Sequence, residues 1–166
     1  MRALGIDPGT AITGWGIVEI GPDGQTLRLV AYGAVTTSAK LALPERLMII
    51  YDDLTDIIAQ YRPDTAAVEA LFFSKNAATA LSVGHGRGAA MLAAAKAGLT
   101  IAEYKPLEVK QAVVGYGGAD KGQVQRMIKL LLNLEEIPKP DDAADGLAVA
   151  ICHLHSARLK FLIDNA

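Results

Sequence analysis

The sequence lacks the features that would cross-link it, anchor it in a membrane or export it. Its one cysteine, Cys152, can form no disulfide within the chain and cannot build a zinc site by itself. No run of about 18 or more uncharged apolar residues is present, which argues against a membrane-spanning helix. The opening MRALGIDPGT reaches an aspartate and a Pro-Gly turn too early to contain the apolar segment of a signal peptide. We therefore expect a cytoplasmic protein with no membrane association.

Charge of one sign is not in large excess either. The formal net charge is −2 and the pI is about 5.9, which argues against a surface that is basic throughout and, taken alone, against nucleic-acid binding. Basic residues are nevertheless concentrated between Lys105 and Lys129, where five lysines and arginines accompany two acidic residues. Such a segment is equally typical of a solvated helix face and of a surface that binds phosphates.

The 166 residues are enough for one domain with a substantial core, and we expect a single domain over 1–166. Short apolar runs and turn residues predict strands at 2–7, 14–20, 26–36, 65–69 and 100–104. An amphipathic pattern predicts a helix at 44–61, and further helices are expected at 76–97 and roughly at 106–114, 121–133 and 141–160. This order predicts an α/β domain in which one mixed five-stranded sheet has helices on both faces.

The expected helix at 76–97 has unusually small side chains. It contains Gly84, Gly86 and Gly88, followed by six alanines. Glycine inside a helix costs about 0.5–1 kcal/mol relative to alanine, so another part of the structure is expected to approach closely. Tight packing on the sheet and a helix-to-helix contact in a dimer both explain this composition. The glycine-rich segment 115–122 is expected to be a mobile loop.

Two carboxylates end predicted strands. Asp7 closes the first strand, although Asp-Pro-Gly by itself is also an ordinary turn. Glu69 ends the strand at 65–69 and has no recognisable turn or capping role. If the two strands are neighbours, both carboxylates emerge at the same end of the sheet.

Three aspartates lie at the start of the last predicted helix. Asp142 and Asp145 are spaced to share one helix face, as are Asp141 and Asp145. Capping explains Asp141 or Asp142 but not Asp145, which lies a turn inside the helix. Acidic groups gathered at one sheet edge repel one another unless a cation offsets their charge, and Mg²⁺ is the common choice in phosphate chemistry. Two such ions roughly 3.5–4 Å apart can activate water and stabilise the leaving oxygen of a phosphodiester.

No Ser-His-Asp or Cys-His pattern competes with these carboxylates. The histidines are scattered along the sequence and are interpreted as structural or surface residues: His85, His153 and His155. The carboxylates are therefore the main candidates for catalysis.

Five ordered sequence blocks point to a family. LGIDPGTAITGWG (4–16), AAVEALFFSKNAATAL (66–81), GHGRGAA (84–90), VKQAVVGYGGADKGQVQRM (109–127) and PDDAADGLAVAICH (140–153) resemble the RuvC family of Holliday junction resolvases. The blocks run in order over nearly the whole chain, whereas a lone Asp-x-Gly motif would be weak evidence. The resemblance implies a ribonuclease H-like fold and an endonuclease that cuts four-way DNA junctions.

By position, the resemblance implies four catalytic and metal-binding acids: Asp7, Glu69, Asp142 and Asp145. Asp141 is then an extra residue, interpreted as a helix cap. Lys110 and Lys121 match basic residues that contact DNA at the scissile region and support catalysis in the family.

Further DNA contacts are implied by the same resemblance. Phe72 matches an aromatic position that packs against unpaired bases of the junction. Phe73 is expected either to join it or to lie in the core. Lys75 and Arg87 are expected to meet backbone phosphates, although Arg87 is equally explained as a buried structural donor.

The resemblance also implies a reaction and its partners. Water activated by Mg²⁺, two ions per active site and replaceable by Mn²⁺, would attack in line and leave a 5′-phosphate and a 3′-hydroxyl. A homodimer would make paired symmetric nicks in four-way junction DNA. The RuvA–RuvB branch-migration complex is the expected protein partner.

Three other functions fit parts of the pattern. An actin-like ATPase or sugar kinase also carries Asp-x-Gly-Thr, matched here by Asp7 to Thr10, but it needs two lobes to enclose a nucleotide. A junction-binding protein without cleavage predicts a missing carboxylate, whereas all four are present. A ribonuclease H acting on RNA–DNA hybrids would use the same acids, so only the regions of Phe72 and Lys121 favour junctions.

Overall fold

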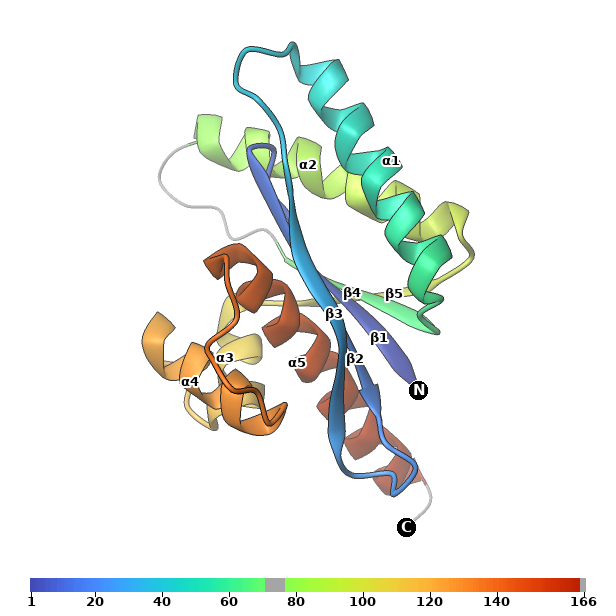
Figure 1. Ribbon diagram of the computed structural model, residues 1–166, viewed down its shortest axis with the longest axis vertical. Helices are drawn as coiled ribbons and strands as arrows, with labels where there is room; N and C mark the ends of the chain where they lie inside the picture. Colours follow the sequence, from blue (N-terminus) through green and yellow to red (C-terminus); the bar gives the residue numbers. More distant parts are fainter. Residues whose placement is uncertain (71–76, 165–166) are drawn as a thin grey trace.

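The computed structural model describes residues 1–70 and 77–164 (Figure 1). Within these ranges the centre of the molecule is a five-stranded sheet in the order β3-β2-β1-β4-β5. The strands are β1 (Arg2–Asp7), β2 (Ile12–Ile20), β3 (Leu27–Thr36), β4 (Thr65–Glu69) and β5 (Thr100–Tyr104). The pairs β1–β2 and β2–β3 are antiparallel, whereas β1–β4 and β4–β5 are parallel. The predicted mixed sheet is therefore confirmed.

Helices cover both faces of this sheet. In the described ranges they are α1 (Leu43–Tyr61), α2 (Ala77–Lys96), α3 (Pro106–Val114), α4 (Lys121–Leu131) and α5 (Asp141–Asp164). The first two, α1 and α2, lie on one face, and α5 lies on the other with α3 and α4 beside it (Figure 1). The helix predicted to end at 133 stops at Leu131, and Asn133 has a positive φ of 50°. None of the described helices is long and apolar enough to cross a lipid bilayer.

Glycines allow α5 to lie directly on β1 and β2. A Cβ atom on Gly146 of α5 would lie 2.6 Å from the backbone of Trp15, and one on Gly14 would lie 1.8 Å from the carbonyl oxygen of Asp142. Since no Cβ atom fits at these positions, helix backbone rests on strand backbone without side chains between them. The contact at Gly14 fixes the start of α5 beside Asp7, because Gly14 is the strand partner of Asp7.

Buried side chains form one core on each face of the sheet. Ile6 of β1 packs with α1 and α2, whereas Ala3 packs with α5 on the other face. Because side chains alternate along a strand, Asp7 lies on the same face as Ala3. In β4, Glu69 likewise follows Ala67 onto the face of α5. The two carboxylates at the strand ends therefore belong to the layer that contains α5.

Candidate active site

Asp7 and Glu69 meet at the ends of two neighbouring parallel strands. Their strands, β1 and β4, are paired along their lengths, so the ends of the two strands lie side by side. Protonated Asp7 donates a hydrogen bond to the Glu69 carboxylate. Burial raises the pKa of Asp7 to about 8, and the charges of Glu69, Asp145 and Asp142 add to this shift. The pair therefore holds a shared proton at neutral pH.

The pKa of Glu69 is also raised. Burial is the largest cause, and the charge of Asp145 adds to it. The hydrogen bond from Asp7 and the charge of nearby Lys110 act in the opposite direction. Glu69 thus lies within electrostatic reach of a second acid from α5 and of a lysine from α3.

The N-terminal turns of α5 supply Asp142 and Asp145. The main chain of Asp142 lies against Gly14. The charge of the Asp142 carboxylate contributes to the raised pKa of Asp7. The pKa of Asp145 is raised by burial first and by the charges of Asp142 and Asp141 after that, whereas Lys121 lowers it. Asp7 of β1 thus lies within electrostatic reach of the other three predicted acids, which come from β4 and α5.

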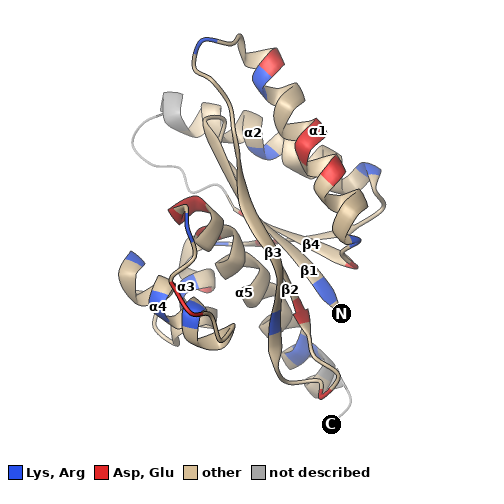
Figure 2. Ribbon diagram, viewed as in Figure 1, with Lys and Arg blue, Asp and Glu red and all other residues tan. Residues whose placement is uncertain are grey.

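Two lysines from different helices border the acids. The Nζ atom of Lys121, the first residue of α4, lies 3.0 Å from Asp145 Oδ2 and 3.5 Å from Asp141 Oδ2. Lys110 of α3 and Lys121 both line a cleft of about 230 Å³ that has Asp145 in its wall. Figure 2 shows the acidic start of α5 and the basic residues of α3 and α4 on the same side of the sheet.

Asp141 does more than occupy the first turn of α5. Its carboxylate, which the sequence suggested as a helix cap, accepts a hydrogen bond of 3.0 Å from Gln125 Nε2 and also faces Lys121. Both partners belong to α4, one turn apart. Sequence reasoning missed Gln125, because nothing local indicates that α4 lies over the start of α5.

A chain of buried and half-buried hydroxyl groups holds the turn that follows Asp7. Thr10 Oγ1 lies 2.6 Å from Ser82 Oγ of α2, and the carbonyl oxygen of Thr10 accepts a hydrogen bond from Thr37 Oγ1. Arg46 of α1 donates to Thr37 Oγ1 over 2.8 Å. The turn is therefore tied to both helices on the opposite face of the sheet. Sequence analysis did not select these residues, although threonine after Asp-Pro-Gly was a visible signal.

Arg87, expected to be a phosphate contact or a buried donor, and His153, interpreted as a structural residue, contact residues other than the four acids. Arg87 of α2 forms an ion pair with Glu103 of β5, and its buried Nε has no hydrogen-bond partner. His153 contacts Thr65 and Tyr104 through its two ring nitrogens, and burial lowers its pKa. The segment with the remaining predicted DNA contacts lies outside the described residues: Phe72, Phe73 and Lys75.

The donor chemistry of the cluster suits a hard divalent cation. In the part of the chain that the structure describes, no three acidic, histidine or cysteine side chains converge closely enough to enclose a metal ion together. Asp7 and Glu69 are instead held by one hydrogen bond, and Asp145 is held by Lys121. A divalent cation would suit these acids, because burial and mutual repulsion disfavour their ionised forms and positive charge would offset both effects.

Comparison with known proteins decides the family. The family model described as crossover junction endodeoxyribonuclease RuvC matches residues 3–153. The chain belongs to the RuvC family. The family assignment and the ribonuclease H-like fold that the sequence blocks implied are therefore confirmed, together with the class of crossover junction endodeoxyribonucleases.

Individual RuvC proteins are similar over nearly the whole chain. The crossover junction endodeoxyribonuclease RuvC of Chloroflexus aggregans is 61% identical over 157 residues, covering 95% of this chain and 94% of that protein. The RuvC of Ruminiclostridium cellulolyticum is 54% identical over 165 residues, covering 99% and 98%. The structure of T. thermophilus RuvC in complex with Holliday junction substrate has a TM-score of 0.90 at 37% identity and covers 96% of both chains.

Proposed function

We propose that this member of the RuvC family is a magnesium-dependent endonuclease that resolves four-way DNA junctions by paired symmetric nicks during recombination and DNA repair. The observation that carries the proposal is the cluster of four carboxylates beside two lysines at one end of the sheet. The complex of the T. thermophilus relative with Holliday junction substrate supports the choice of DNA.

The carboxylates are proposed as the metal ligands: Asp7, Glu69, Asp142 and Asp145. When bound, two Mg²⁺ ions would supply an activated water and stabilise the leaving oxygen of the phosphodiester, and Mn²⁺ should replace them. Asp7 is the central ligand in this proposal, because it interacts with all three other acids. Its proton must leave before it can bind a cation, so metal binding releases a proton at neutral pH.

The lysines are proposed to act on the DNA backbone. Lys110 and Lys121 line one cleft with Asp145, so a phosphate in that cleft would meet positive charge next to the acids. Phe72, with Phe73 beside it, is proposed to stack on unpaired bases, and Lys75 to meet a phosphate. For Arg87 we favour the structural alternative, because its charge is already neutralised by Glu103.

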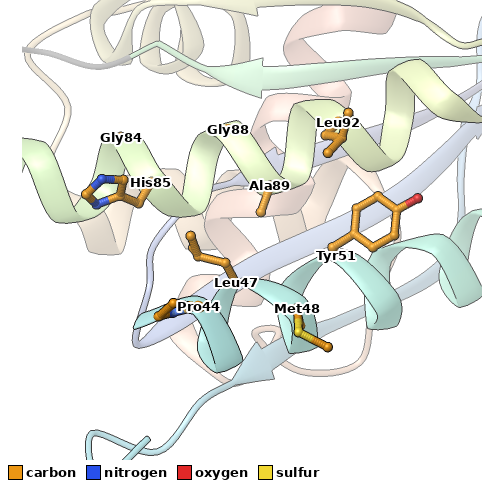
Figure 3. A pocket seen from close by; sticks show the side chains of 9 residues that line it. All are labelled: Pro44, Leu47, Met48, Tyr51, Gly84, His85, Gly88, Ala89 and Leu92. Atoms are coloured by element: carbon orange, nitrogen blue, oxygen red, sulfur yellow. The ribbon is translucent and has the colours of Figure 1, made fainter. Parts of the chain in front are cut away.

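A homodimer is proposed, since a two-fold junction that is cut twice needs two active sites. An apolar groove of about 550 Å³ runs between α1 and α2 (Figure 3). In it, Met48 and Leu92 are 63% and 60% exposed. A Cβ atom on Gly86 would meet Gly9 at 2.9 Å, whereas one on Gly88 would meet nothing within 4 Å. We therefore propose that one side of α2 packs on the turn after Asp7 and the other contacts the second copy.

The wider setting follows from the substrate. We propose the RuvA–RuvB branch-migration complex as the partner that delivers junctions, and the cytoplasm as the location because bacterial chromosomal DNA lies there. Residues 1–166 are proposed to form one nuclease domain, since the five strands share one sheet and α5 packs across its centre.

The test is cleavage of a synthetic four-way junction with and without Mg²⁺, beside linear duplex and an RNA–DNA hybrid. Paired nicks in the junction alone, absent without metal and in the Asp7→Asn variant, are the expected result. The Asp7→Asn variant should still bind the junction. Cleavage of the hybrid would instead assign a ribonuclease H activity, and normal turnover by Asp7→Asn would refute the metal site.

A further inference from the structure

Lys121 is held between two carboxylates that differ in position. Asp145 faces the proposed metal site and its side chain is 34% exposed, whereas the side chain of Asp141 is 63% exposed. The Lys121 ammonium group lies 3.0 Å from Asp145 Oδ2 and 3.5 Å from Asp141 Oδ2. Lys121 therefore has one acidic partner inside the site and one at its rim.

The contacts of Asp141 bind it to the start of α4. It accepts a hydrogen bond from Gln125 and faces Lys121, and these residues lie one turn apart on the same helix face. The start of α4 is itself fixed, because the Asp120 side chain accepts a hydrogen bond of 2.8 Å from the Gln123 amide. Asp141 thus keeps Lys121 near α5 independently of Asp145.

A divalent cation and the Lys121 ammonium group compete for Asp145. Both bind the lone pairs of the carboxylate, and positive charges that share one carboxylate repel each other. Lys121 contacts Oδ2 of Asp145, so a cation that binds this oxygen displaces Lys121. The displacement is easier if the ammonium group has a second acidic partner within reach.

We infer that Asp141 is a positioning residue that takes over Lys121 when Asp145 binds a metal ion, so that the ammonium group leaves Asp145 without leaving the cleft. The inference rests on the proposed function, because it requires Asp145 to be a metal ligand. It assigns a role to an acid that the metal site itself does not need.

The test measures Mn²⁺ binding to the DNA-free protein, with free Mn²⁺ followed by electron paramagnetic resonance. Asp141→Asn should weaken binding about two- to five-fold, as expected when an exposed ion pair can no longer form. In a Lys121→Met background the same substitution should have less than about half of that effect, because only the loss of general charge remains. Glu136→Gln, which removes an exposed acid before α5, should bind as the wild type does.

The outcomes separate this inference from the metal site. If Asp141→Asn weakens Mn²⁺ binding equally in both backgrounds, Asp141 acts through its charge alone and the inference is wrong. If Asp7→Asn leaves Mn²⁺ binding unchanged, the ion does not bind at the acidic cluster, and both the metal site and the inference fail. If Asp7→Asn loses Mn²⁺ binding and Asp141→Asn has a smaller effect in the Lys121→Met background, the metal site and the inference are both supported.

Discussion

Replacement of Asp7 by asparagine should stabilise the metal-free protein, and the gain should grow with pH. In the folded protein Asp7 keeps its proton up to about pH 8, whereas its ordinary pKa is 3.8. Between these values the folded state binds more protons than the unfolded state. The free energy of unfolding therefore falls as the pH rises through this window. Asparagine cannot ionise and can still donate a hydrogen bond to Glu69, so the variant escapes this loss.

The size of the effect follows from the shift. Each pH unit inside the window is worth about 1.4 kcal/mol, so the wild type loses up to about 4 kcal/mol by pH 7 and about 1.5 kcal/mol by pH 5. For a chain of this length each kcal/mol corresponds to roughly 2–4 °C in melting temperature. The substitution that should abolish cleavage is thus expected to give a more stable protein. The reason is that a buried acid needed for metal binding lowers the stability of the metal-free protein.

The assay is urea unfolding at pH 5 and pH 7 in the presence of EDTA. The free energy of unfolding of Asp7→Asn should exceed that of the wild type at both pH values, and by more at pH 7. Asp53 is an exposed acid on α1, so Asp53→Asn should unfold like the wild type at both pH values. Excess Mg²⁺ in place of EDTA should reduce the difference in the free energy of unfolding between the variant and the wild type, because Mg²⁺ stabilises the wild type alone. A destabilised variant, or a margin that is equal at both pH values, would show that folding does not shift the pKa of Asp7.

Three further predictions concern packing, assembly and DNA. Gly14→Ala should destabilise the protein by about 1–3 kcal/mol, because its Cβ atom would collide with Asp142. The control variant Gly88→Ala should fold at least as stably as the wild type. Equal melting curves for the two variants would contradict the close contact at Gly14. Leu92→Glu should convert the proposed dimer into a monomer in analytical ultracentrifugation with little change in monomer stability, and an unchanged sedimentation coefficient would exclude this face as the dimer contact. Phe72→Ala should slow junction cleavage in single-turnover assays with little loss of stability; an unfolded variant would instead identify Phe72 as a core residue.

Local sequence patterns were enough to predict the helices and strands. An apolar run predicted the strand at 65–69, and Pro140 indicated a helix that begins at 141. The structure has both elements at these positions. The ends that shifted are set by contacts outside the segment or by single backbone angles, as at Asn133. Local reasoning singled out Glu69 and Asp145 as carboxylates with no structural role, whereas the choice of Asp142 over Asp141 came from the family resemblance.

What these acids do to one another was decided only by the tertiary structure. The sequence contains no information at short range about the depth of Asp7 below the surface, which is the main cause of its raised pKa. Nor could it place α4 over the start of α5, and without that contact Asp141 was interpreted as a helix cap. The two explanations for the small residues of α2 were likewise left open, since only the fold could show that Gly86 faces the turn after Asp7 and Gly88 faces open space. Residue type, spacing and the family resemblance singled out the acids that we propose as metal ligands, and the packing of distant elements determined their protonation and their partners.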